Sequence, residues 1–120
     1  MKKLLFFLII LGITTQVSAK LKEKHLIGKW KYSVVTDQGN MSGVFKFAKV
    51  DDKISGEVNT DDGYTVPFTK IEIKGKDTLY LELETNNDTI KLTLIVDGKQ
   101  FKGTGTSSQG DAPVTGEKIE

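Results

Sequence analysis

Clusters of turn-forming residues recur along the chain at nearly regular intervals, and this spacing limits the fold more than any other feature. Each cluster offers Gly, Asn or Asp, which supply positive φ angles or bond their own backbone in tight turns. The cluster centres lie at positions 38, 51, 62, 75, 87, 97 and 110, which are 10 to 13 residues apart. Seven turns therefore separate eight short segments.

The segments between the turns alternate apolar and polar residues. Leu79, Leu81 and Leu83 occupy every second position, with Tyr80 and Glu82 between them, and positions 90, 92, 94 and 96 repeat the pattern. This is the period of a half-buried strand, and no window of helical length has an apolar stripe at three-to-four spacing. We therefore predict an all-β domain of eight strands.

The fourth segment changes phase. Its apolar residues are even-numbered at positions 66 and 68 but odd-numbered at positions 71 and 73, and Pro67 lies in the same stretch. An extra residue in one strand shifts the side-chain alternation by one, and proline is tolerated in sheets mainly at edges and bulges. We predict a β-bulge or a short break around Thr69–Lys70.

Eight sequential strands joined by short turns form an antiparallel up-and-down meander. Closing the meander into a small barrel removes two exposed edges, and the interior is then filled by side chains or holds one small ligand. An open sandwich is the alternative. A membrane barrel with its apolar face outward is also possible, but the turns are short at both ends and several segments are shorter than the roughly nine to eleven residues that cross a bilayer. We expect a monomer without stable membrane insertion.

The N-terminal segment has the features of a signal peptide. Lys2 and Lys3 precede an apolar run from Leu4 to Ile13, and Val17–Ala19 supplies small residues for a signal peptidase. The run is about half the roughly 20 residues that a membrane-spanning helix needs. With no cysteine for a lipid anchor, we predict that residues 1–19 are removed and that residues 20–120 form one exported domain, periplasmic or extracellular.

The composition of this domain excludes several classes of function. Removal of Lys2 and Lys3 reduces the 17 basic residues to 15 lysines against 16 acids, and the chain has no arginine. A nucleic-acid partner is therefore not expected. With no cysteine and a single histidine, zinc and thiol chemistry lack ligands, and a Ser-His-Asp triad would have to use His25. We predict no cofactor.

Two pairs of carboxylates are the remaining candidates for catalysis or for calcium. Asp51–Asp52 and Asp61–Asp62 both fall in predicted turns, where aspartate already bonds the backbone. His25 lies in the leader before the first strand, which we expect to be mobile. We therefore predict no enzyme activity, no metal and no catalytic residue.

A short motif precedes the first predicted strand. Gly28-Lys29-Trp30 is the Gly-x-Trp sequence that opens lipocalins and related calycin barrels, and the chain resembles the small secreted lipocalin-like domains of bacteria. The resemblance implies that Trp30 packs across the closed end of a lipocalin-like barrel. It also implies a basic cover from the last strand, where Lys118 stands in place of the usual arginine.

The alternation assigns a set of residues to the barrel interior. The predicted ligand-binding side chains are Trp30, Tyr32, Phe45, Phe47, Phe68 and Phe101. Gly56, Gly103 and Gly105 share their phase and either open a cavity or let strands bend around large neighbours. We favour a filled interior, with a small apolar ligand bound at one open mouth. The alternative function is a protein-interaction or inhibitor module of the cell envelope with no small-molecule ligand.

Overall fold

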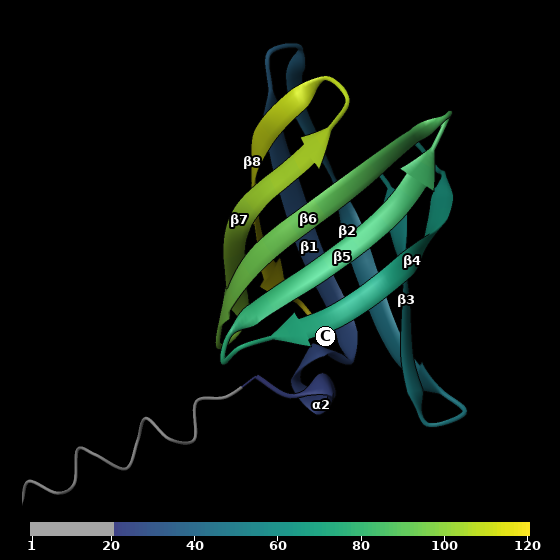
Figure 1. The fold of residues 1–120 in the computed structure, drawn as a ribbon, viewed down its shortest axis with the longest axis vertical. Helices are drawn as coiled ribbons and strands as arrows, with labels where there is room; N and C mark the ends of the chain where they lie inside the picture. The colour runs from purple at the N-terminus through teal and green to yellow at the C-terminus, as the bar shows by residue number, and fades with distance from the viewer. Residues whose placement is uncertain (1–20) are drawn as a thin grey trace, which may run out of the picture.

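The computed structural model describes residues 21–120, which form one antiparallel barrel preceded by a short helix (Figure 1). The predicted signal peptide, residues 1–19, lies outside the described residues. The elements are α2 (Glu23–Leu26), β1 (Gly28–Thr36), β2 (Gly39–Val50), β3 (Lys53–Thr60), β4 (Thr65–Lys74), β5 (Thr78–Thr85), β6 (Asp88–Asp97), β7 (Gln100–Ser107) and β8 (Gly110–Lys118).

Each strand pairs with its neighbours in sequence, and the first strand also pairs with the last. The β1–β8 ladder runs from Trp30 opposite Lys118 to Val34 opposite Val114. This ladder closes the barrel, so the predicted eight-stranded up-and-down barrel is confirmed and the open sandwich is excluded.

The turns occur where the sequence predicts them. Asp51, Asp52, Asn86 and Asn87 have positive φ angles of 52°, 65°, 37° and 70°. Asn and Asp tolerate this left-handed region because their short side chains bond the local backbone. Two-residue turns of this kind match the twist of the paired strands, so the local sequence sets each hairpin.

The predicted irregularity in β4 is also present. The β4–β5 register shifts between Phe68 and Lys70, which places the bulge at Thr69. After the shift the odd-numbered residues Ile71 and Ile73 continue the inward face. The one-residue change of phase in the sequence therefore has a direct structural counterpart.

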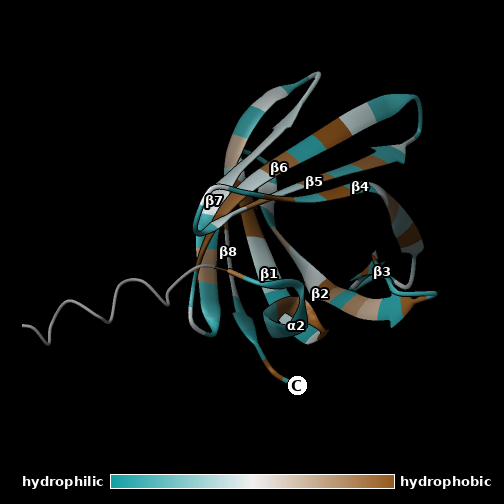
Figure 2. Ribbon diagram, turned by 60° about the horizontal axis from the view of Figure 1, so that its bottom comes forward, coloured by the Kyte–Doolittle hydropathy of each residue, from teal (hydrophilic) through white to brown (hydrophobic). Residues whose placement is uncertain are grey.

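Apolar side chains of alternate residues form the core inside the barrel. Figure 2 shows the matching bands of hydrophobic and hydrophilic residues along the strands. Leu81 and Leu94 are fully buried at 0% exposure, and no polar or charged residue among residues 21–120 is buried. Gly56, Gly103 and Gly105 face inward as predicted, and a Cβ on Gly103 would clash with the β6 backbone. These glycines let strands approach closely and do not by themselves open a cavity.

One end of the barrel is sealed by α2 and by Trp30. Leu21 and Leu26 are buried, and the Trp30 indole Nε1 donates a hydrogen bond of 3.0 Å to the Leu26 carbonyl. Lys118 lies with its Nζ 5.8 Å from the Trp30 ring centroid and donates to the His25 carbonyl at 3.0 Å. The lysine therefore provides the cover that arginine provides in the resembling families. We call this the closed end.

The structure corrects our expectation for the leader. His25 is part of α2, and Leu21 donates a backbone hydrogen bond to Lys76 in the β4–β5 turn. The segment is ordered because its two leucines complete the core at the closed end. No helix among residues 21–120 is long and apolar enough to cross a membrane.

Candidate functional site

The structure brings all six predicted ligand-binding residues into one aromatic cluster. Tyr32 and Phe101 stack on Phe45 with centroid distances of 4.5 and 5.7 Å. Phe68 stacks on Phe47 at 5.5 Å and meets Phe45 edge-on at 5.4 Å, and Trp30 contacts Phe101 at 5.6 Å. These centroid separations are those of favourable aromatic pairs, which add to the free energy gained by burial.

This cluster is packed and mostly closed to solvent. Five of its members are buried, and only Phe68 is partly exposed. The rings contact one another inside the barrel between the closed end and the open mouth, and this packing supports the filled interior that we favour. They form the floor beneath the open mouth, and Trp30 lies furthest from it at the closed end.

The inward side chains at the opposite end are less well covered. Four turns lie at this open end: β1–β2, β3–β4, β5–β6 and β7–β8. Next to them Val34, Val66, Ile90 and Ala112 are only partly buried. Met41, opposite Val34 in the ladder, is 58% exposed. The open mouth therefore has an apolar lining that reaches solvent.

Tyr32 places a polar group at the edge of the aromatic floor. A Cβ on Gly43 would lie 2.8 Å from the Tyr32 hydroxyl, so glycine makes room for the phenol. Burial raises the pKa of Tyr32, and the carboxylates of Asp61 and Asp62 raise it further. Both effects favour the protonated hydroxyl, which is a hydrogen-bond donor.

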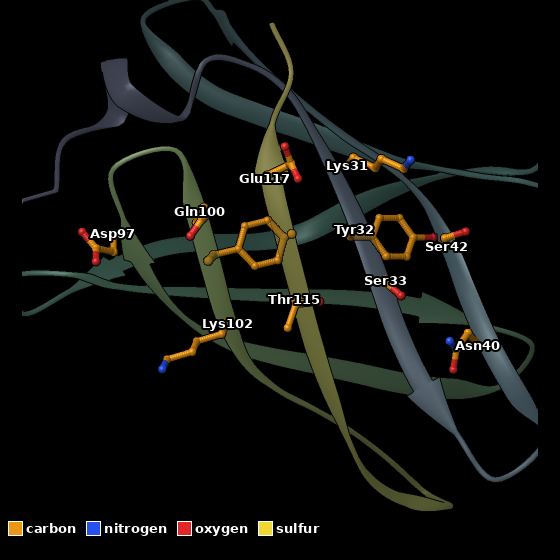
Figure 3. A pocket seen from close by; sticks show the side chains of 12 residues that line it. Lys31, Tyr32, Ser33, Asn40, Ser42, Asp97, Gln100, Lys102, Thr115 and Glu117 are labelled. Carbon is orange, nitrogen blue, oxygen red and sulfur yellow. The ribbon is translucent and has the colours of Figure 1, made fainter.

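A concave surface lies on the outside of the wall. It has a volume of about 730 Å³ and crosses β7, β8, β1 and β2 (Figure 3). Its outward side chains include Lys31, Ser33, Ser42, Lys102, Thr115 and Glu117. Neither residue composition nor spacing predicted this outer groove, because closure of β8 onto β1 brings the two ends of the sequence together.

The carboxylate pairs have structural roles in turns. Asp51 and Asp52 are exposed and occupy the left-handed positions of the β2–β3 turn. Asp61 accepts a hydrogen bond from Ser42. Within residues 21–120, no group of three His, Cys, Asp or Glu side chains is placed to hold a metal ion.

No protein-family model matches the sequence, and no curated protein sequence matches it either. Among solved structures, the fold is similar to a redesigned β barrel, b11L5F_LGL, with TM-score 0.63, 22% identity, and coverage of 82% of this chain and 95% of that chain. It is also similar to the redesigned barrel mFAP1 bound to DFHBI, with TM-score 0.61, 21% identity, and coverage of 81% and 97%.

A natural protein has the same architecture. The fatty acid binding protein of Schistosoma mansoni, in complex with arachidonic acid, has TM-score 0.55 and 16% identity, with coverage of 82% of this chain and 98% of that chain. At these identities the likeness extends to the fold alone, a small β-barrel.

Proposed function

We propose that this protein binds one small apolar ligand at the open mouth of the barrel. The observation that carries the proposal is the difference between the two ends. The closed end is covered by α2, with Trp30 only 1% exposed, whereas Val34, Val66 and Ile90 at the open end remain partly exposed. Partly exposed apolar side chains gain free energy when an apolar ligand covers them.

The interior limits how such a ligand binds. Because the aromatic cluster fills the barrel below the mouth, the ligand lies on this floor and against the ring of valine and isoleucine side chains. The Tyr32 hydroxyl offers a hydrogen-bond donor beside the floor. Barrels of similar fold that bind DFHBI or arachidonic acid support a binding role.

A fluorescence titration tests the mouth. The probe is 1-anilinonaphthalene-8-sulfonate, whose emission rises in an apolar environment. Ile90→Gln replaces a partly buried apolar side chain at the mouth and should weaken binding about tenfold, since one such contact is worth roughly 1–2 kcal/mol.

The matched control for this titration is Val50→Gln. Val50 is 55% exposed at the end of β2 next to the closed end. Binding that is equally weakened in both variants, or in neither, would reject the mouth as the site. Recovery of the protein from its own host with a bound apolar molecule, detected by native mass spectrometry, would identify the ligand.

We also propose that the protein is exported to the periplasm or the medium and acts without catalysis. The support for export is the basic, apolar and small-residue order of Met1–Ala19. Intact mass spectrometry of the protein from its host should give a chain beginning at Lys20. A chain that retains Met1 would reject export by this signal.

Exposed apolar side chains at the mouth support a second candidate function, a protein-interaction or inhibitor module of the envelope. Tyr64 in the β3–β4 turn is 68% exposed. The Asp61 N–H in the same turn donates a hydrogen bond to the carbonyl of Ser42 on β2, which places this turn beside the exposed Met41. If a partner protein binds this rim, Tyr64→Ser should abolish its binding and leave the affinity for the fluorescent probe unchanged.

A further inference from the structure

The barrel wall is incomplete between β3 and β4. Their ladder has three pairs, Glu57 with Pro67, Val58 with Val66 and Asn59 with Thr65. Below Pro67 the two strands diverge toward the closed end, as Figure 1 shows. Among residues 21–120, residues 53–56 of β3 then pair only with β2, and residues 68–74 of β4 pair only with β5. We call these two free edges the seam.

The sequence explains where the ladder ends. Pro67 has no backbone N–H, so it removes a donor at the last pair, and the bulge after Phe68 bends the strand further away. Below this point each strand has a row of backbone donors and acceptors on one side with no ladder partner within residues 21–120. Such an edge is a template for another extended chain.

Apolar side chains line the seam and are incompletely covered. Seven partly buried apolar residues pack against the core, and four of them lie on the seam edges: Ile54, Phe68, Ile71 and Ile73. An extended chain on the β4 edge would place every second side chain over Ile71 and Ile73. Apolar residues at those positions would complete the core at this point.

The charge on the outer side of the seam indicates which outward side chains would suit a strand added there. The two seam edges contain Lys53, Lys70 and Lys74 against a single carboxylate, Glu72. Glu72 is shared, with its oxygens 3.9 Å from Lys70 and 3.7 Å from Lys74. The outer side of the seam therefore has an excess of positive charge, which favours acidic residues in a strand placed beside it.

The other edge of β4 already binds a strand with this pattern. In β5, Leu79, Leu81 and Leu83 point inward opposite Ile73, Ile71 and Phe68. On the outer face Glu82 lies opposite Lys70, and the Tyr80 ring lies 4.5 Å from the Lys74 Nζ. The strand that already pairs with β4 therefore alternates inward leucines with outward acidic or aromatic residues.

We propose that the seam is a docking site for an extended segment of a partner protein, which adds as a β-strand to the free edge of β4. The segment has apolar residues at alternate positions facing Ile71 and Ile73, with acidic residues between them facing Lys70 and Lys74. Main-chain hydrogen bonds supply the affinity, and the side-chain alternation supplies the specificity.

The experiment is an NMR titration of the ¹⁵N-labelled protein with the synthetic peptide Leu-Tyr-Leu-Glu-Leu-Glu-Thr, which copies residues 79–85. Saturable shifts and slower amide exchange are expected at residues 53–56 and 68–74. The control peptide Leu-Tyr-Leu-Pro-Leu-Glu-Thr lacks a central donor and should cause neither.

Charge-reversal variants test the recognition of side chains. Lys70→Glu with Lys74→Glu changes two exposed positions and should weaken peptide binding about tenfold, because each exposed charge pair contributes modestly. Lys102→Glu makes the same exchange on β7, away from the seam, and should bind like the unchanged protein.

Three outcomes would overturn the proposal. The peptide could fail to bind, or its shifts could lie at the open mouth instead of the seam. The seam resonances could also move with protein concentration alone, which would make a second copy of this chain the occupant.

Discussion

The β5–β6 part of the wall and the β3–β4 part are built from the same kinds of residue but differ in closure. β5 and β6 form eight consecutive pairs, and Leu81, Leu92 and Leu94 beneath them are buried. β3 and β4 form three pairs, and the isoleucines beside them stay partly exposed. An unbroken alternation seals one part of the wall, whereas Pro67 and one extra residue leave the other part open.

This difference separates stability from recognition within one small barrel. Surface removed from water on β5 and β6 contributes to the free energy of folding. Apolar surface left exposed at the mouth and the seam can contribute only to the free energy of binding a ligand or a partner. The following predictions test whether the two parts of the wall differ as described.

The largest expected effect is on stability. Leu81→Ala removes a side chain with 0% exposure and should lower the free energy of unfolding by about 3 kcal/mol. Ile71→Ala removes the side chain directly opposite in the ladder, and its cost should be about half as large because the site is already partly exposed. Urea denaturation of the two variants measures both. Equal losses would contradict the comparison.

The second effect is on amide exchange in the free protein. Amides of β4 that face the seam have no ladder partner and should exchange about a hundredfold faster than those of β5 and β6, because opening a free edge requires less than global unfolding. Hydrogen exchange followed by NMR resolves the individual residues. Uniform protection across β4 would show that the seam is closed in solution.

The smallest effect concerns the outer face of β5. The hydrogen bond from Tyr80 to Glu82 raises the pKa of Tyr80 to about 12. The folded state therefore holds this proton more tightly than the unfolded state, so its contribution to stability is complete below pH 10 and is lost between pH 10 and 12.

Tyr80→Phe removes this contribution. The stability difference between the variant and the unchanged protein should narrow as the pH rises from 9 to 11.5, as measured by urea denaturation at each pH. Tyr32, whose pKa is also raised, is present in both proteins and cancels. A difference that stays constant with pH would show that the hydrogen bond does not contribute.

The sequence was sufficient to predict the fold because hairpin turns and strand alternation are local. Asp51–Asp52 and the Asn86–Asn87 pair specify their turns within a few residues, and the change of phase around Thr69 specifies the bulge. The helix α2 has four residues, too few for a periodic pattern, so its role in sealing the closed end could not be predicted.

The site was harder to predict because it depends on closure. The large aromatic residues were correctly assigned to the interior, but Val34, Ile90 and Ala112 line the mouth and were missed. Their exposure depends on which end α2 covers. Pro67 was read as a sign of a bulge in β4, and the seam itself was not predicted, because the end of the ladder also depends on the course of β3.

Both ends of the described chain lie at the closed end of the barrel, opposite the mouth. Leu21 is bound to the β4–β5 turn, and Ile119 donates to the Lys29 carbonyl at the start of β1, so both ends of the described chain leave from the same pole (Figure 1). A tether, tag or neighbouring domain joined at either terminus therefore presents the mouth outward, and a short bridge between the termini should permit circular permutation at the β5–β6 turn.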